Sequence, residues 1–154
     1  MSRELLSRGY SLAESTRAMC TSLDDLADTQ PAVDLAPSDL FEHLQIIGVP
    51  GLLRGVDPSA FHVVVARFAN ERVATAMAFD YAGDCLVFNV MTLEPARRRG
   101  IATAVTHLLL HDAAARGCAT ASLQATEMAE GVYAAAGFRD LGRILEYVPV
   151  PALD

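Results

Sequence analysis

The residue types and spacings that could do chemistry are concentrated in one short stretch, residues 90–103. An apolar run breaks at Pro95, three arginines follow at 97–99, and Gly100 opens a helical pattern. A helix start leaves backbone N–H groups without partners and carries partial positive charge, so main chain and dipole together hold an anion there. Gly100 allows close approach to the backbone, and Ala102 keeps the next turn small. The stretch predicts a phosphate-binding turn.

A second motif, Tyr-Ala-Ala-Ala-Gly-Phe from Tyr133 to Phe138, follows about one strand and one helix later. The spacing Arg97-x-x-Gly100-x-Ala102 resembles the acetyl-CoA pyrophosphate loop of the GNAT acetyltransferase superfamily, which is written Gln/Arg-x-x-Gly-x-Gly/Ala. The second motif resembles the Tyr-x-x-x-Gly-Phe signature of the same superfamily. The order and separation of the two motifs support the resemblance, which covers roughly residues 37–150.

The resemblance implies that acetyl-CoA is the cosubstrate, with its pyrophosphate over residues 97–103 and its pantetheine arm along the backbone of residues 90–93. It implies that Tyr133 is the general acid, because a phenol with a pKa of about 10 stays protonated and can donate to a departing thiolate. Thr126 stands where an asparagine commonly touches the pantetheine. The predicted cofactor-binding residues are Val90, Met91, Thr92, Leu93, Arg97, Arg98, Arg99, Gly100, Ile101, Ala102, Thr103 and Thr126.

No residue is singled out as the general base. Glu94, Glu127, Asp84 and Asp80 are carboxylates expected near the cleft, and a water chain to one of them could remove the ammonium proton. Each has the alternative role of a solvated loop residue or a helix cap. Asn89 is a polar residue in an apolar strand, so its side chain must find partners or line the cleft.

The histidines and cysteines point to no metal or disulfide. His107 and His111 share a helix face, but the His-Glu-x-x-His pattern and a third ligand are missing, so we predict no metal site. Cys20, Cys85 and Cys118 are odd in number and scattered in apolar surroundings. They are predicted to be free, buried thiols.

Composition limits the class of protein. The chain has 154 residues, 52% of them hydrophobic, and a formal net charge of −7. This length suits one domain, and the negative charge disfavours nucleic acids and anionic membranes as partners. We see no signal peptide and no membrane-length apolar run, so a cytoplasmic location is expected. A dinucleotide-binding oxidoreductase is excluded, because no Gly-x-Gly-x-x-Gly follows an early strand.

Periodicity and turn residues predict a mixed α/β fold. Residues between short turns form antiparallel hairpins, and a strand, helix, strand sequence after them forms a βαβ crossover with parallel strands. The predicted elements are a helix from Pro37 ended by Gly48 and Pro50, strands over 61–68, 72–79 and 85–92, a helix over 101–116, a strand over 119–124, a helix from Thr126 to Gly137, and strand segments over 138–150. This order matches the central mixed sheet and flanking helices that the GNAT resemblance implies.

Residues 1–36 are expected to be an amino-terminal extension and residues 37–154 the acetyltransferase domain. The segment Leu5 to Tyr10 resembles the turn from Ala134 to Phe138, and an extended run follows both. The extension is therefore either a remnant of an upstream GNAT-like half or an ordinary helix with a first strand over residues 16–23.

The resemblance implies an acetyl-CoA-dependent N-acetyltransferase that acts on a primary amine of a small molecule, peptide or protein. The alternative is a non-catalytic acyl-CoA-binding or sensing module of the same fold. The sequence does not specify the amine acceptor. It leaves the oligomeric state open, with a homodimer as one alternative.

Overall fold

The computed structural model describes residues 2–24, 26 and 33–150. The helices are α1 (Ser2–Ser7), α2 (Leu40–Ile46), α3 (Ile101–Ala115) and α4 (Glu130–Ala135), with short 3-10 turns η1 (Pro58–Ala60) and η2 (Glu94–Ala96). The strands are β1 (Tyr10–Ser22), β2 (Asp34–Ser38), β3 (Phe61–Phe68), β4 (Glu71–Tyr81), β5 (Asp84–Thr92), β6 (Thr120–Ala125) and β7 (Arg139–Pro149).

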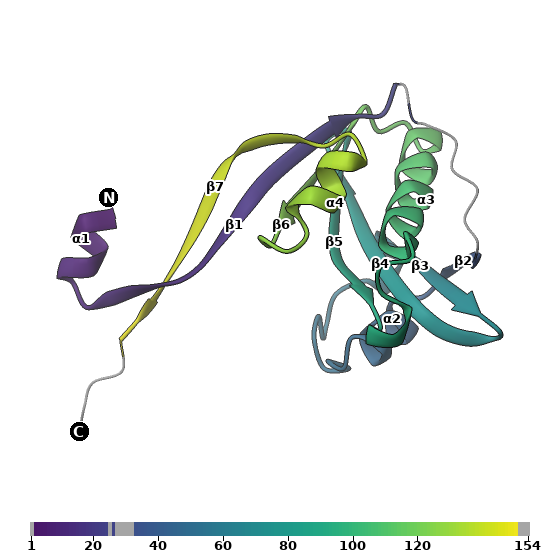
Figure 1. The fold of residues 1–154 in the computed structure, drawn as a ribbon, viewed down its shortest axis with the longest axis horizontal. Helices are drawn as coiled ribbons and strands as arrows, with labels where there is room; N and C mark the ends of the chain where they lie inside the picture. Colours follow the sequence, from purple (N-terminus) through teal and green to yellow (C-terminus); the bar gives the residue numbers. More distant parts are fainter. Residues whose placement is uncertain (1, 25, 27–32, 151–154) are drawn as a thin grey trace.

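The strands form one seven-stranded sheet in the order β2-β3-β4-β5-β6-β1-β7 (Figure 1). Only β5 and β6 are parallel, and every other described pairing is antiparallel. The mixed α/β fold with hairpins and a βαβ crossover is therefore confirmed. Among the described residues, no helix is long and apolar enough to cross a membrane.

Alternate residues of the central strands face two separate cores. Val64 and Ala76 belong to the core beneath α3 and α4, whereas Val63, Val65 and Met77 belong to the core beneath α2. This alternation is the period-two pattern of a strand buried on both faces. Because α2 and α3 cover opposite faces, the middle of the sheet is shielded from water on both sides.

Helix α3 confirms the predicted apolar repeat. Ile101, Val105, Leu109 and Ala113 recur every four residues and are all buried. The helix ends just before Gly117, which has a φ of +95° and supplies the left-handed residue of a helix stop. Its opposite end lies at the predicted phosphate-binding turn.

Two helix starts were predicted too early. Helix α2 begins at Leu40 rather than near Pro37, because Pro37 lies in β2 and the side chain of Asp39 caps the helix. Helix α4 begins at Glu130 rather than at Thr126. The carbonyl oxygen of Thr126 accepts N–H bonds from the following turn instead, so this residue starts the connection to the helix.

The amino-terminal strand lies inside the sheet, next to the edge strand β7. β1 starts at Tyr10, six residues before the predicted start, and lies between β6 and β7. It pairs with β7 from Tyr10 opposite Pro149 to Cys20 opposite Arg139. The two strands run together away from the rest of the molecule, towards α1 (Figure 1). We refer to β1 and β7 beyond the end of β6 as the arm.

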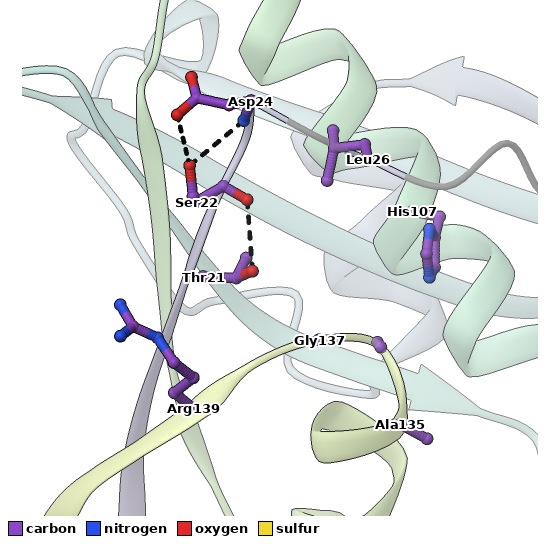
Figure 2. Close-up of a pocket in the computed structure, with 9 residues that line it drawn as sticks. Thr21, Ser22, Asp24, Leu26, His107, Ala135, Gly137 and Arg139 are labelled. Carbon is purple, nitrogen blue, oxygen red and sulfur yellow. Dashed lines mark hydrogen bonds between the residues drawn. The ribbon is translucent and has the colours of Figure 1, made fainter.

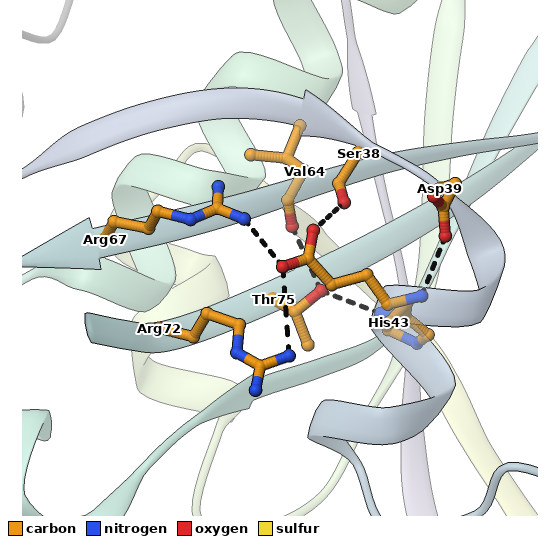
Figure 3. Close-up of polar contacts among 8 residues, drawn as sticks. Ser38, Asp39, His43, Val64, Arg67, Arg72 and Thr75 are labelled. Carbon is orange, nitrogen blue, oxygen red and sulfur yellow. Dashed lines mark hydrogen bonds and ion pairs between the residues drawn. The ribbon is translucent and has the colours of Figure 1, made fainter. Parts of the chain in front are cut away.

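A polar network holds α2 against β3 and β4 (Figure 3). Glu42 accepts a hydrogen bond from Ser38 and pairs with Arg67 at 2.6 Å. The pKa of Glu42 is lowered, chiefly by the Ser38 hydrogen bond and also by Arg67 and Arg72, against the opposing effect of burial. These contacts fix the side of the helix that faces away from the apolar core.

His43 lies on the buried side of α2, and its side chain is fully buried. The Thr75 hydroxyl donates to the carbonyl oxygen of Val64 at 3.1 Å, so in its 2.8 Å contact with His43 it must accept from the ring Nδ1–H (Figure 3). Nε2 is then the unprotonated nitrogen, and it is buried without a partner among the described residues. Burial lowers the pKa of His43 to about 4.

We predict that the protein loses stability as pH falls from about 6.5 to about 4. The unfolded chain binds a proton at His43 in this range while the folded chain does not, so the free energy of unfolding falls with pH, by up to about 3 kcal/mol. Chemical denaturation across this range measures the slope. His43→Asn keeps a donor to Thr75 but cannot titrate, so it should flatten the slope. An unchanged slope in this variant would show that His43 is not its source.

Candidate active site

The predicted phosphate-binding turn has the backbone geometry of an exposed anion cradle. Gly100 is the N-cap of α3 with a φ of +73°, and Arg98 has a φ of +59°. A Cβ built on Gly100 would meet no atom within 4 Å. The space over the first turn of α3 is therefore open to a ligand.

The charges around this turn favour an anion. Arg97, Arg98 and Arg99 are all exposed, and the first turn of α3 contains no acidic residue. The first intrahelical bond runs from the N–H of Ala104 to the carbonyl of Gly100, so the N–H groups of residues 101–103 precede the ladder and face the turn. Three exposed cations therefore directly precede a helix start here.

Strands β5 and β6 separate just before this turn. They pair in parallel only from Asp84 opposite Thr120 to Val87 opposite Leu123. The pairing of β5 with β4 shifts register between Phe88 and Met91, where Asn89 takes a φ of +50°. This bulge redirects β5 away from β6, and the predicted parallel pairing of the two strands is confirmed.

A cleft of about 270 Å³ occupies the gap between the two strands. Its lining comes from β5, β6 and the connection into α4: Val87, Phe88, Asn89, Val90, Leu123, Gln124, Thr126, Ala129 and Tyr133. The cleft therefore brings together Val90, Thr126 and Tyr133, which were predicted separately, and includes Asn89. The chain runs from this cleft directly into the anion cradle, because β5 ends at Thr92.

Tyr133 is buried, with 8% of its surface exposed. Its ring packs edge-on against Phe138, with ring centroids 5.9 Å apart. Burial raises the pKa of the phenol, so the hydroxyl is protonated at neutral pH. The residue thus has a packing role and is also among the residues that line the cleft.

Two predicted backbone contacts are already occupied. The Leu93 N–H donates to the carbonyl of Val73 at 2.9 Å, and the Leu93 carbonyl accepts from Ala96. The Thr92 carbonyl accepts from Arg97 Nε at 3.0 Å. Of the predicted stretch from residue 90 to 93, Val90 is the residue that lines the cleft.

The candidate carboxylates divide into two pairs. Asp80 is held by Arg116 at 2.6 Å, and Asp84 accepts hydrogen bonds from Thr120 and Ser122. Both lie at the closed end of the β5 and β6 pair, away from the cleft, so the expectation that they lie near it was wrong. Glu94 and Glu127 are exposed next to cleft and cradle residues, in the 3-10 turn after β5 and directly after Thr126.

A second, larger pocket of about 490 Å³ lies between the end of β1, α3 and the end of α4 (Figure 2). Thr21, Asp24, His107 and Arg139 are among its lining residues. It contains none of the predicted cofactor-binding residues. In the part of the chain that the structure describes, no group of three or more His, Cys, Asp or Glu could hold a metal.

The three cysteines are free, and Cys85 is buried. Burial and the nearby Asp80 raise the pKa of its thiol to about 12. A thiol with that pKa is protonated at neutral pH and is not a nucleophile.

Comparison with known proteins identifies the family. Residues 21–138 match the model of the acetyltransferase (GNAT) family, and the chain therefore belongs to this family. A GCN5-related N-acetyltransferase from Kribbella flavida is similar in structure, with a TM-score of 0.76 and 21% identity over 96% of this chain. One from Sphaerobacter thermophilus has a TM-score of 0.71 and 19% identity over 95% of this chain.

The chain spans only 62% and 54% of the length of these two structures. A predicted acetyltransferase with acetyl-CoA from Clostridium acetobutylicum matches 70% of this chain and 90% of its own, with a TM-score of 0.55 and 21% identity. These likenesses show the fold. No curated protein matches the chain in sequence.

Sequence reasoning passed over several residues that the structure brings to the site. Gln124 and Ala129 line the cleft but belong to no motif. Away from the cleft, His43 belongs to no motif either, and it stands between Leu40 and Leu44 on the apolar side of α2. Its helical spacing from Leu40 was a signal that it would be buried.

We predict that Gly100→Leu weakens CoA binding by about 100-fold or more, because a side chain over the cradle removes several charge-assisted hydrogen bonds. Gly117→Leu is the matched control, since Gly117 also has a positive φ and open space around it but lies at the other end of α3. Calorimetry with CoA measures both variants. Equal affinities in the two would place the pyrophosphate elsewhere.

Proposed function

We propose that the protein is an acetyl-CoA-dependent N-acetyltransferase that transfers the acetyl group directly to a primary amine. The observation that supports this most is the continuity of two features along β5. The splayed end of the strand opens the cleft that holds Tyr133, and after a connection over residues 93–96 the chain enters the cradle at the start of α3. A long cofactor with a phosphate group at one end and a thioester at the other fits this order.

In this proposal, some residues bind the cofactor and others transfer protons. The N–H groups of residues 101–103, with Arg97, Arg98 and Arg99, would bind the pyrophosphate. Val90 and Thr126 would flank the pantetheine arm. Asn89 lies in the same cleft and is a candidate for contact with the substrate.

In the reaction, the neutral amine nitrogen attacks the thioester carbonyl carbon and forms the amide bond. The bond from that carbon to sulfur breaks, and the sulfur leaves with the electron pair. Tyr133 would donate its hydroxyl proton to the departing thiolate and recover one from solvent. The nitrogen gives up its proton through water, with Glu94 and Glu127 as the exposed carboxylates beside the cradle and the cleft.

A non-catalytic acyl-CoA-binding module is the second candidate function, favoured by the absence of a buried carboxylate base among the residues that line the cleft. Release of free thiol from acetyl-CoA on a panel of primary amines distinguishes the two candidates. An enzyme releases thiol in proportion to added amine. CoA binding in calorimetry without thiol release from any amine would favour the binding module.

We predict that Tyr133→Phe lowers kcat by about 10²- to 10⁴-fold, the usual contribution of a general acid. Affinity for acetyl-CoA should barely change, because the hydroxyl acts only as charge develops on sulfur. Turnover of the best amine measures the effect, and a melting curve checks the fold. Tyr81→Phe is the control, since Tyr81 is 76% exposed and distant from the cleft. A rate within about twofold of wild type would reduce Tyr133 to a packing residue.

A further inference from the structure

The two ends of the chain repeat one structural unit. Helix α1 leads through Gly9, with a φ of +81°, into β1, and α4 leads through Gly137, with a φ of +92°, into β7. Each helix has six residues, and an aromatic residue follows each glycine: Tyr10 in the first unit and Phe138 in the second. Equivalent residues in the two units differ by 128 in number.

This repeat is arranged around a local two-fold axis. Thr16 and Ile144 are equivalent by that offset, and they pair directly with each other in the antiparallel β1 and β7. An antiparallel pair in which equivalent residues face each other has a two-fold axis through that pair. The axis lies within the arm and relates α4 and β7 to α1 and β1.

The two-fold axis relates the position of β6, beside β1, to a position beside β7 that no described strand occupies. β6 pairs with residues 17–22 of β1, and the equivalent residues of β7 are 145–150. β7 is the last strand of the described sheet, so this edge has no partner strand there. On the filled side, Met19 of β1 is only 4% exposed, whereas its equivalent Tyr147 is half-buried.

The main-chain N–H and C=O groups of equivalent residues in β1 and β7 point the same way, as the two-fold axis requires. The N–H of Val150 donates to the carbonyl of Gly9, so Val150 faces β1, and Leu145, Tyr147 and Pro149 face outward by alternation. On the filled side, Leu23 donates to Ala119, so residues 17, 19 and 21 of β1 face β6. The equivalent residues therefore face outward at both edges, and Leu145 and Tyr147 offer donors, whereas Pro149 offers only its carbonyl.

Exposed apolar side chains surround the empty position. Leu6 of α1 is 53% exposed, Leu12 of β1 is 49% exposed, and Leu145 is 43% exposed. Leu12 pairs with Tyr147, so these two residues and Leu145 share one face of the arm. In the filled half, the equivalent of Tyr147 is Met19, which belongs to the core beneath α3 and α4, whereas the equivalents of Leu145 and Leu12 are Arg17 and Asp140, which form an ion pair.

We infer that residues 145–150 of β7, with the adjoining apolar face of the arm, are the docking surface for a second unit of this acetyltransferase fold. That unit would add its equivalent of β6 antiparallel to β7 by strand addition, and would take α1 and β1 as its own last helix and strand. A second copy of this chain does not fit, because β1 already covers the edge of its β6. The solved structures from Kribbella flavida and Sphaerobacter thermophilus each leave more than a third of their length outside the match, which is consistent with a second unit.

To test this inference, the second unit is added to the same polypeptide chain. A copy of residues 34–129 is placed directly before Ser2, so that Ala129 of the copy takes the position equivalent to Met1. The copied β6 then leads into α1 through the same turn that leads β6 into α4. Amide hydrogen exchange by NMR is compared between this extended chain and the natural chain.

The amides of Leu145 and Tyr147 should exchange at least about tenfold more slowly in the extended chain than in the natural chain. They would then be hydrogen-bonded within a ladder that opens only when the sheet unfolds. The amides of Glu146 and Val148, which face β1, are the internal reference. A folded copy with unchanged exchange at Leu145 and Tyr147 would overturn the inference. A copy that stays unfolded would also overturn it, since the inference holds that the arm is all that the copy lacks.

Two lysine variants of β7 test whether the slow exchange depends on residues 145–150. Tyr147→Lys places a charge at the equivalent of buried Met19 and should abolish the slow exchange in the extended chain. Leu141→Lys adds the same charge on β7 outside residues 145–150 and should preserve it. Light scattering on the natural chain tests whether a second copy of this chain occupies the surface instead. A dimer that Tyr147→Lys dissociates and Leu141→Lys does not would assign the surface to a second copy and overturn the inference.

Discussion

The site depends on one constraint on β5: its main-chain groups must be paired, and the strand changes partners along its length. At its start β5 is bonded to β4 on one side and to β6 on the other. After Val87 the pairing with β6 ends while the pairing with β4 resumes beyond the bulge at Asn89. On this side the divergent segment is a strand edge that β6 does not cover in the described sheet, so it is suited to an extended ligand that completes the ladder.

The same strand positions the cradle. Leu93 is fixed by bonds to Val73 and Ala96, and Arg97 is tied back to Thr92. These bonds use up the groups immediately after β5 and set the direction in which the chain enters α3. The buried face of α3 then holds the helix against the sheet over its full length, so the N–H groups of its first turn are fixed relative to the cleft.

Motifs and local periodicity predicted the parts of the fold that depend on neighbouring residues. The repeat of Ile101, Val105 and Leu109 is sufficient to place α3, and short turns are sufficient to place the hairpins. The position of β1 between β6 and β7 could not be predicted this way, because it depends on pairing with residues more than a hundred positions away. The burial of His43 depends likewise on Thr75, on a different element. In the site, the motifs predicted Tyr133 and the cradle, but Gln124 enters the cleft only through the splay of β6.

The placement of Tyr133 depends on this distant pairing. Helix α4 has only six residues and is too short to be stable alone, so tertiary contacts must hold it. Arg17 of β1 provides one of them, an ion pair with Glu130 of α4 at 3.4 Å, and it also pairs with Asp140 of β7 at 2.5 Å. Tyr133 and Phe138 also share a core with Met19 of β1. The amino-terminal strand, which no motif marks, is thus part of the structure that holds the proposed general acid in the cleft.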